Sequence, residues 1–245
     1  MRTFEGRTAL VLGANGGIGA AIARALGEAG ARLVLAARDA DGLHRVQSEV
    51  DSEEVRVVPT DITDEESVRA LVEQASADGM DIAVNNAGLS HEPSPLGELG
   101  IDVADSVLEV TLRGTLVAMH HELAALPDGG SIVNIASTAG VAGAPGMAAY
   151  AAAKHGVVGL TRTAAVDYAG RGVRVNAVAP GSTDSGGVAA QPGEVKQGIG
   201  RSAPLGRLGR PEEVAAAVAW LASPASAYTT GTVLTVDGGK GARGA

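Results

Sequence analysis

The sequence TALVLGANGGIGAAIARALGEAG, residues 8–30, contains the pattern that decides the fold prediction. It begins with an apolar run over residues 8–13 and continues through the glycine-rich segment GANGGIG. It then places Ile18, Ile22 and Leu26 four residues apart. A short apolar run bounded by glycine is typical of a buried strand, and apolar residues at a four-residue spacing are typical of one helix face. The stretch therefore predicts a strand, a tight turn and a helix.

The same alternation continues along the rest of the chain. Helical patterns, such as those of residues 63–75 and 210–223, separate six further apolar runs that we expect to be strands: residues 31–37, 54–58, 81–88, 131–137, 173–181 and 232–238. Runs that are apolar on both faces are typical of a parallel sheet covered by helices. The sequence therefore predicts a single doubly wound, Rossmann-type α/β domain over residues 1–245, with a seven-stranded parallel sheet flanked by helices.

Two of the helices have recognisable start signals. Thr63 and Glu66 have the spacing of a capping box, which predicts that Thr63 caps the helix of residues 63–75. Pro211 is followed by two acidic residues and is expected at the first position of the helix of residues 210–223.

Composition excludes several classes of protein. The chain has 245 residues, no cysteine and a formal net charge of −9. The missing cysteines exclude disulfides and thiolate metal ligands, and the acidic balance argues against a nucleic-acid partner. No apolar stretch reaches the roughly 18 residues of a membrane span, and the first apolar run is too short for a signal peptide. We therefore expect a cytoplasmic protein with a small-molecule substrate and no metal, nucleic-acid or membrane partner.

The glycine-rich turn is a candidate phosphate-binding site. Gly13, Gly17 and Gly19 lie where the first strand meets the first helix. Glycines in that position allow a tight turn and a close approach of pyrophosphate to the backbone, where the N–H groups at the start of the helix are unpaired. The alternative is an ordinary glycine turn that only permits close packing of the helix.

The end of the second strand bears on the choice of nicotinamide cofactor. A site for NAD usually has an acidic residue there, which binds the ribose 2′-hydroxyl. Here the strand ends in Ala37 and Arg38, which leave room for a 2′-phosphate and offer it a guanidinium partner. We therefore expect NADP in preference to NAD. Two alternatives remain open: Arg38 is a solvated surface residue, or Asp39 reaches the ribose.

A tyrosine and a lysine form the candidate catalytic pair. The chain has three tyrosines and three lysines, and Tyr150 and Lys154 lie four residues apart, on one face of a predicted helix. A nearby ammonium group favours the phenolate and lowers the pKa of a tyrosine. Ser137, at the end of the predicted strand of residues 131–137, is expected at the same sheet edge. The alternative is a surface contact between Tyr150 and Lys154.

Together these motifs resemble the short-chain dehydrogenase/reductase (SDR) family. The resemblance extends from about Thr8 to Gly239. It rests on the ordered set GANGGIG, Asp61–Ile62, NNAG at residues 85–88, Ser137, Tyr150-x-x-x-Lys154, NAVAPG at residues 176–181 and RLGRPEEVA at residues 207–215. It implies a nicotinamide-dependent enzyme that interconverts a carbonyl group and a secondary alcohol by hydride transfer.

The resemblance also implies roles for individual residues. Tyr150 would be the general acid or base, Lys154 would hold the nicotinamide ribose and keep the pKa of the tyrosine low, and Ser137 would bind the substrate oxygen. With Arg38, the predicted cofactor contacts are Gly13, Asn15, Gly17, Ile18, Gly19, Asp61, Ile62, Asn85, Ala87, Gly88, Tyr150, Lys154, Pro180, Gly181, Thr183 and Ser185.

The chain departs from the family pattern at a few positions. Thr111 stands where the family usually has an asparagine, the fourth catalytic residue, which holds a water that links the lysine to solvent. We include Thr111 among the predicted catalytic residues and expect a slower or rewired proton relay, or a protein that binds cofactor but catalyses poorly. Leu12 replaces a usual threonine, and Thr183 is more polar than the usual residue.

The substrate and the assembly are less determined by the sequence. Residues 90–100 and a small segment at about 185–210 are expected to contact the substrate, and His91 is expected to be exposed to solvent. A β-ketoacyl-carrier-protein reductase is the alternative enzyme; it would need basic residues near the crevice, and Arg171 is the candidate. The resemblance implies a homotetramer or homodimer, with helices at about residues 103–125 and 149–169 as the main contact.

Overall fold

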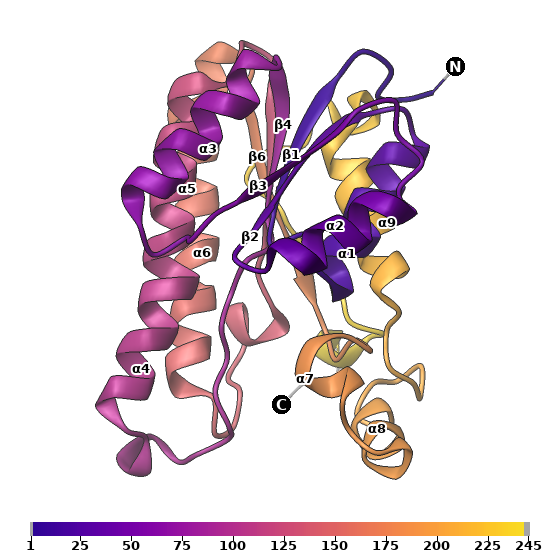
Figure 1. Ribbon diagram of the computed structural model, residues 1–245. Coiled ribbons are helices and arrows are strands. Elements are labelled where there is room, and N and C mark those ends of the chain that lie inside the picture. The colour runs from indigo at the N-terminus through magenta and orange to yellow at the C-terminus, as the bar shows by residue number, and fades with distance from the viewer. Residues whose placement is uncertain (1, 243–245) are drawn as a thin grey trace.

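The computed structural model describes residues 2–242, so Met1 and residues 243–245 of the predicted domain lie outside it. Seven parallel strands form one sheet in the order β3-β2-β1-β4-β5-β6-β7. Helices cover both of its faces (Figure 1). All seven predicted strands are confirmed: β1 Thr8–Leu12, β2 Arg32–Ala37, β3 Val55–Pro59, β4 Met80–Asn85, β5 Ser131–Ile135, β6 Arg174–Pro180 and β7 Val233–Val236.

The central and edge strands differ in burial. Every residue of β1 and β5 is buried, as expected for strands with helices on both faces and strands on both sides. The edge strands β3 and β7 are mostly half-buried or exposed, so the burial on both faces that we expected from their apolar runs is not found for these two. Each of them has a neighbour on one side only, and its outer side meets solvent.

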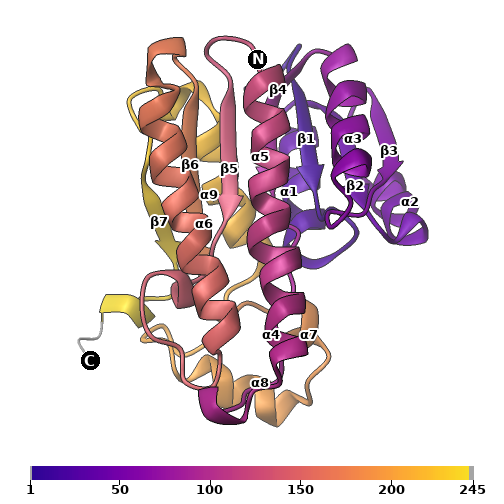
Figure 2. The same ribbon diagram turned by 90° about the vertical axis from the view of Figure 1, so that its left-hand side faces the viewer.

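Two helical layers enclose the sheet (Figures 1 and 2). One layer consists of α1 Gly17–Glu28, α2 Ala40–Glu49 and α9 Pro211–Ala222, and the other of α3 Glu65–Ala77, α5 Gly114–Ala125 and α6 Ala148–Asp167. The first layer packs Ile22, Leu26 and Leu221 against the sheet, and the second packs Leu71 and Leu123. None of the helices within residues 2–242 is long and apolar enough to cross a membrane.

Short helices lie beyond the carboxyl ends of the strands. Figure 1 shows α4 Ile101–Leu108 on one side of this region and α7 Gly186–Ala189 and α8 Gly193–Gly200 on the other. The helix expected over residues 103–125 is divided into α4, a wider π-helical turn η2 Glu109–Arg113, and α5. Single 3₁₀ turns complete the chain: η1 Leu96–Glu98, η3 Thr138–Gly140, η4 Ala169–Arg171, η5 Pro224–Ser226 and η6 Lys240–Ala242.

One of the two predicted helix starts is confirmed and the other is wrong. Pro211 is the first residue of α9. The N-cap of α3 is Asp64, whose carboxylate accepts from the Glu66 amide, and not Thr63. The Thr63 hydroxyl instead donates a hydrogen bond to the Asp61 carboxylate at 2.7 Å. The same carboxylate accepts from the Thr63 amide, and the two bonds close a tight turn.

A buried polar network joins the two central strands to the helices above them. The Asn85 amide group of β4 donates to Glu122 of α5 at 2.9 Å and to Asn134 of β5 at 3.0 Å. Asn134 in turn donates to Thr161 of α6 at 2.9 Å. Glu122 is fully buried, and burial raises the pKa of its carboxyl group to about 7, against the opposing effect of the hydrogen bond from Asn85.

This pKa predicts how Glu122 affects stability. Because the folded-state pKa lies above 4.5, the ordinary value for a glutamate side chain, the protonated carboxyl group favours the folded state. Its contribution is fully present below about pH 4.5 and is lost as the pH rises through about 7. Relative to Glu122→Gln, the free energy of unfolding of the wild type should therefore fall by about 2–3 kcal/mol between pH 5 and pH 8.

Urea unfolding of both proteins across this pH range measures the difference. Other titrating groups, including Lys154, cancel in the subtraction because both proteins contain them. A difference that stays constant with pH would show that Glu122 does not titrate in this range.

Candidate active site

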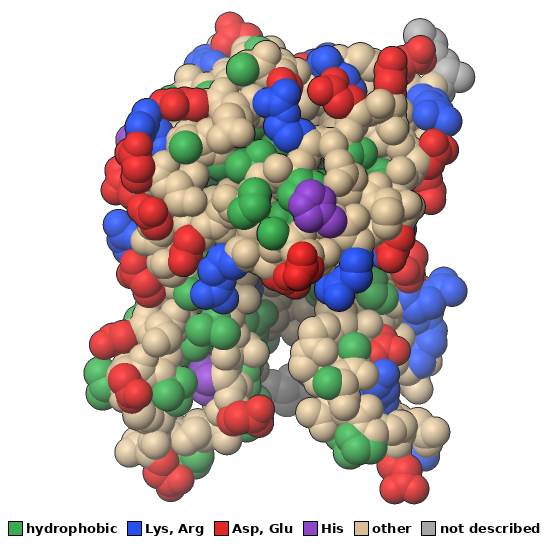
Figure 3. Space-filling model, viewed as in Figure 1, with side chains coloured by type: hydrophobic (Ala, Val, Ile, Leu, Met, Phe, Trp, Pro, Cys, Tyr) green, Lys and Arg blue, Asp and Glu red, His purple; other side chains and the backbone are tan. Residues whose placement is uncertain are grey.

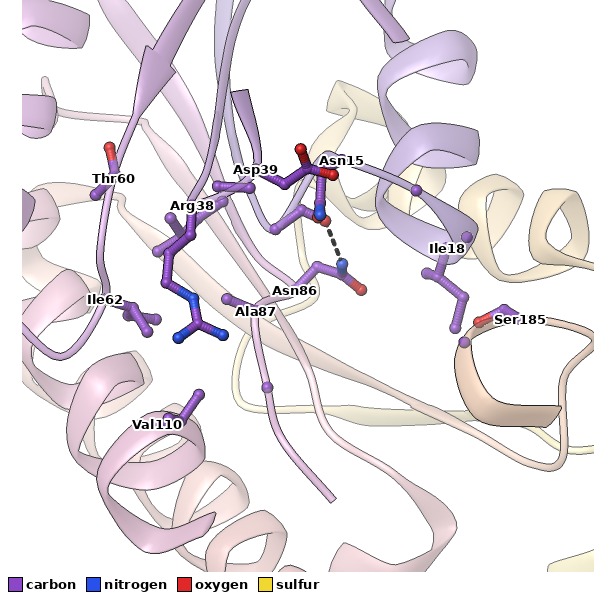
Figure 4. A pocket seen from close by; sticks show the side chains of 17 residues that line it. Asn15, Ile18, Arg38, Asp39, Thr60, Ile62, Asn86, Ala87, Val110 and Ser185 are labelled. Carbon is purple, nitrogen blue, oxygen red and sulfur yellow. Dashed lines mark hydrogen bonds between the residues drawn. The ribbon is translucent and has the colours of Figure 1, made fainter. Parts of the chain in front are cut away.

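Two adjoining cavities open at the carboxyl ends of the strands, where the space-filling view shows a hollow between the two lower parts of the molecule (Figure 3). The first has a volume of about 570 Å³ and is bordered by the glycine turn and the ends of β1, β2 and β4 (Figure 4). The second has a volume of about 730 Å³ and is bordered by Ser137, Tyr150 and Lys154. Five residues line both: Ile18, Asn86, Gly88, Ser185 and Gly186. The two cavities are therefore parts of one crevice, at the edge where a doubly wound sheet binds its ligands.

The glycines of the turn have two different physical roles. A Cβ on Gly13 would lie 2.6 Å from the Ala87 amide nitrogen, and one on Gly19 would lie 2.0 Å from the Gly13 carbonyl oxygen. These two positions need glycine because β1, α1 and the end of β4 pack so closely. Around Gly16, in contrast, no atom lies within 4 Å of the place of a Cβ. The turn thus combines close packing with an open backbone face.

The open face has the character of a phosphate site. Gly16 is the N-cap of α1, with no side-chain cap and no acidic residue in the first turn of the helix. The first amide groups of a helix lack intrahelical acceptors, and the helix dipole adds positive potential there. Because the turn lines the first cavity, these features fit the pyrophosphate of a dinucleotide.

Asn86 holds the glycine turn against the end of β4. Its side-chain amide donates to the Gly13 carbonyl oxygen at 2.8 Å, the bond drawn as a dashed line in Figure 4. The sequence pattern NNAG singled out the preceding Asn85 as a cofactor contact. Asn85 lines neither cavity and belongs to the buried network with Glu122. Successive side chains of an extended segment point to opposite sides, so the neighbouring Asn85 and Asn86 have different surroundings.

Arg38 and Asp39 have different surroundings at the end of β2. Figure 4 shows the Arg38 side chain extending into the first cavity toward Ile62 and Val110. The Asp39 carboxylate also borders the cavity, but it caps α2 by accepting from the Gly42 amide at 3.0 Å. It also lies 3.8 Å from Arg45. Of the two side chains, Arg38 is thus the one available to a ligand in this cavity.

Asp61, a predicted cofactor contact, does not line either cavity, although its neighbours Thr60 and Ile62 line the first. Its carboxylate accepts hydrogen bonds from the amide and the hydroxyl of Thr63. These two bonds are the main reason that the pKa of Asp61 is lowered, and the charge of Arg38 adds a smaller contribution.

Ser137, Tyr150 and Lys154 converge on the second cavity. β5 ends at Ile135, so Ser137 lies two residues beyond the strand, where it caps a short 3₁₀ turn and its hydroxyl oxygen accepts from the Ala139 amide. Lys154 follows Tyr150 by one turn of α6, and its ammonium nitrogen lies 5.7 Å from the centre of the tyrosine ring. That nitrogen donates to the Ile135 carbonyl oxygen at 2.6 Å.

Burial dominates the pKa values of this pair. It lowers the pKa of Lys154 to about 8 and raises the pKa of Tyr150, against an opposing hydrogen-bond effect from Ser137. The direction for Tyr150 is opposite to the lowering by Lys154 that we expected. In a desolvated site the neutral forms of both groups are favoured, and a neutral phenol is the form that donates a proton.

Thr111 is buried in the π-helical turn and lines neither cavity. Its hydroxyl accepts from the Leu89 amide at 2.8 Å and donates to the Leu89 carbonyl oxygen at 2.9 Å. Both Thr111 and Lys154 lie near Gly88, since a Cβ there would lie 3.5 Å from the Lys154 nitrogen and 3.6 Å from the Thr111 oxygen. Thr111 thus fastens the segment after β4 to the helix, and its catalytic role stays a prediction.

The remaining predicted contacts and several unpredicted residues complete the crevice. Gly13, Asn15, Gly17 and Ala87 line the first cavity, Pro180, Gly181 and Thr183 line the second, and Gly19 lines neither. His91, expected to be exposed, is half-buried and lines the second. Val188, Gln191 and Ile199 of the expected substrate segment also line the second cavity. The lining residues that no sequence pattern predicted include Gly16, Thr60, Asn86, Val110 and Met147. Within residues 2–242, no three histidine or acidic side chains are grouped so that they could hold a metal ion.

Comparison with known proteins gives consistent matches over nearly the whole chain. A family model described as enoyl-(acyl carrier protein) reductase matches residues 13–240. The chain is 44% identical to cis-4-hydroxycyclohexanecarboxylate dehydrogenase of Sinomonas cyclohexanicum, over 96% of this chain and 97% of that protein. It is 36% identical to cyclohexanol dehydrogenase of Acinetobacter sp. (strain SE19), over 96% and 95% of the two chains.

A solved structure also matches this chain over nearly its whole length. The crystal structure of levodione reductase superimposes with a TM-score of 0.94 at 34% sequence identity, covering 98% of this chain and all of the other. Sequence, fold and crevice agree, and the chain belongs to the short-chain dehydrogenase/reductase family of oxidoreductases, which act on alcohol and carbonyl groups with a nicotinamide cofactor.

Proposed function

We propose that this oxidoreductase interconverts a secondary alcohol on a six-membered carbon ring and the corresponding ketone, with NADP as cofactor. The observation that carries the proposal is the convergence of Ser137, Tyr150 and Lys154 on a cavity continuous with the glycine turn. The names of two relatives contain a cyclohexane ring. Apolar side chains of the second cavity support a ring substrate: Leu89, Met147, Val188 and Ile199.

In this mechanism the protein positions the substrate and moves the proton. Ser137 donates a hydrogen bond to the substrate oxygen, which stabilises negative charge on it during reduction. Tyr150 is half-buried, and desolvation favours its protonated form, so it transfers its phenolic proton to that oxygen during reduction and takes a proton back during oxidation. Lys154, anchored on the Ile135 carbonyl oxygen, lies beside the tyrosine and lines the second cavity. The bound nicotinamide supplies or accepts the hydride at the carbonyl carbon.

The preference for NADP rests on the charge at the end of β2. Arg38 borders the first cavity, Ala37 beside it is small, and the Asp39 carboxylate is already engaged in capping α2. A guanidinium group without a competing carboxylate suits a phosphate better than a ribose hydroxyl.

The carrier-protein alternative is supported by two relatives named 3-oxoacyl-[acyl-carrier-protein] reductase, which are 36% and 35% identical to this chain. It requires basic residues near the crevice. Arg171, the residue we expected there, lies before the amino end of β6, at the opposite edge of the sheet. Its guanidinium group binds Asp128 and the carbonyl oxygens of Leu123 and Leu126. The expectation that Arg171 is near the crevice is therefore wrong, and we favour a free ring substrate.

Assembly and location are also proposals. Exposed apolar side chains on α4, α5 and α6, namely Ile101, Leu116 and Val166, support a homodimer or homotetramer built through these helices. A cytoplasmic location stays a prediction.

The first prediction concerns the proton donor. Tyr150→Phe removes the phenolic proton and should lower kcat for cyclohexanone reduction by at least about 100-fold, because general acid catalysis typically contributes that much. The dissociation constant of NADPH, measured by fluorescence titration, should stay within about threefold. The matched control is Tyr228→Phe, at a fully exposed tyrosine, which should leave both values unchanged. Retained turnover in Tyr150→Phe would rule out the proposed acid.

The second prediction concerns the cofactor. Arg38→Ala removes the cation beside the cavity and should weaken NADPH binding by about 10- to 100-fold, the usual value of a charge-assisted hydrogen bond. NADH binding should change by less than about threefold. The control is Arg69→Ala, at an exposed position on α3. Equal affinity of the wild type for both cofactors, or a preference for NADH, would contradict the assignment of Arg38.

A further inference from the structure

The carboxyl group of Glu122 in α5 is buried and takes no direct part in the proposed reaction. It belongs to a network of side chains that also contains Asn85 of β4, Asn134 of β5 and Thr161 of α6. Among the hydrogen bonds that join two side chains within residues 2–242, only those of this network are wholly buried. Apolar residues of similar shape would fill the same space without the cost of burying polar groups, so the network is a candidate for a role beyond packing.

The network joins the three elements that build the crevice. Its residue in β4 directly precedes Asn86, whose side chain holds the glycine turn. Its residue in β5 directly precedes Ile135, whose carbonyl oxygen accepts a hydrogen bond from Lys154. Its residue in α6, Thr161, lies about two helical turns beyond Lys154, on the same face of the helix. A change in the geometry of the network would therefore reach both cavities.

Hydrogen-bond donors and acceptors in the network do not balance. Asn85 donates through both of its N–H groups, to Glu122 Oε2 and to Asn134. Asn134 donates to Thr161 and to the Met119 sulfur, and the Thr161 hydroxyl donates to its own helix. All these donors are thus in use, yet Glu122 Oε1 and Asn85 Oδ1 are buried and have no partner among the described residues. A proton on the carboxyl group would add one donor to the network.

An ionised Glu122 would also lack a counter-ion. Its carboxyl group forms no ion pair with any residue that the structure describes, and the charged side chains of α3, which packs against α5, are exposed. The buried or half-buried titratable groups around α5 all have other partners: Asp81, Glu109, His121, Tyr150, Lys154 and Arg171. Burying an unpaired carboxylate is strongly unfavourable, so the network fits the neutral acid, in agreement with its raised pKa.

We propose that Glu122 is a positioning residue that acts only in its neutral form: when protonated it holds β4, β5 and α6 in the arrangement that binds the cofactor and orients Lys154, and its ionisation disturbs that arrangement. The role of Lys154 in this inference rests on the proposed function. The cofactor then binds better to the protonated protein, so its affinity should fall as the pH rises through neutrality.

Cofactor titrations at a series of pH values test the inference. The dissociation constant of NADPH, or of NADH if NADH binds more tightly, is measured by fluorescence for the wild type and for Glu122→Gln, whose amide is neutral at every pH. Between about pH 6 and pH 8.5, the ratio of the wild-type constant to that of the variant should rise by about fivefold or more, the lower end of typical coupling between two sites. Titration of Lys154 and Tyr150 affects both proteins and cancels in the ratio.

The matched control is Leu123→Ala, at the neighbouring position of α5, which is buried in the core but lies outside the network. This substitution leaves a cavity and lowers stability while the Glu122 carboxyl group remains. Its dissociation constant should therefore change with pH as that of the wild type does. Circular dichroism at each pH verifies that the proteins are folded. For cyclohexanone reduction, the ratio of kcat of the wild type to kcat of Glu122→Gln should fall over the same pH range.

A measurement on the wild type alone keeps the inference testable if Glu122→Gln does not fold. Infrared difference spectra over the same pH range should show the loss of a protonated carboxyl group. The midpoint of this loss should move to higher pH when the cofactor is bound, because coupling between two sites is reciprocal. An identical midpoint with and without cofactor would overturn the inference.

The outcomes separate the inference from the proposed function. A ratio of dissociation constants that changes by less than about twofold with pH would overturn the inference, whether or not the ketone is reduced. A ratio that rises as expected without any reduction of cyclohexanone would overturn the ring-alcohol function and leave the inference in place. A rising ratio together with turnover that falls in parallel would support both.

Discussion

The crevice depends on the close contact between the glycine turn and the end of β4. Gly13 and Gly19 each leave no room for a Cβ, and the Asn86 side chain ties the turn to the start of the segment that leads to Gly88. The same contact brings the first cavity next to the second, because residues just after β4 line both. A larger residue at Gly13 or Gly19 would separate the phosphate-binding face from the reacting groups.

Sheet order explains why this contact occurs where it does. β1 has β2 on one side and β4 on the other, so the chain direction of the crossovers reverses beside β1. At such a switch point the loops leave the sheet in opposite directions and a crevice remains between them. The glycine turn follows β1 and the NNAG segment follows β4, which places both at this point.

Burial then gives the reacting groups their character. Lys154 is buried and Tyr150 is half-buried, and desolvation favours the neutral form of each. Thr111 holds the neighbouring backbone in place. Its hydroxyl accepts a hydrogen bond from the Leu89 amide and donates its one proton to the Leu89 carbonyl oxygen. The threonine thus contributes to the shape of the site through the backbone, and not as a group on the cavity wall.

Local pattern was sufficient for the seven strands, the glycine turn and the pairing of Tyr150 with Lys154, because strand periodicity, turn chemistry and helical spacing are properties of short segments. It was insufficient wherever a side chain's role depends on contacts between distant segments. Packing decided that Asn86, and not Asn85, lines the crevice. It also decided that the Asp61 carboxylate binds Thr63 and that the Thr111 hydroxyl binds the Leu89 backbone. The same holds for the raised pKa values of Tyr150 and Glu122, because desolvation exists only once the tertiary structure has excluded water.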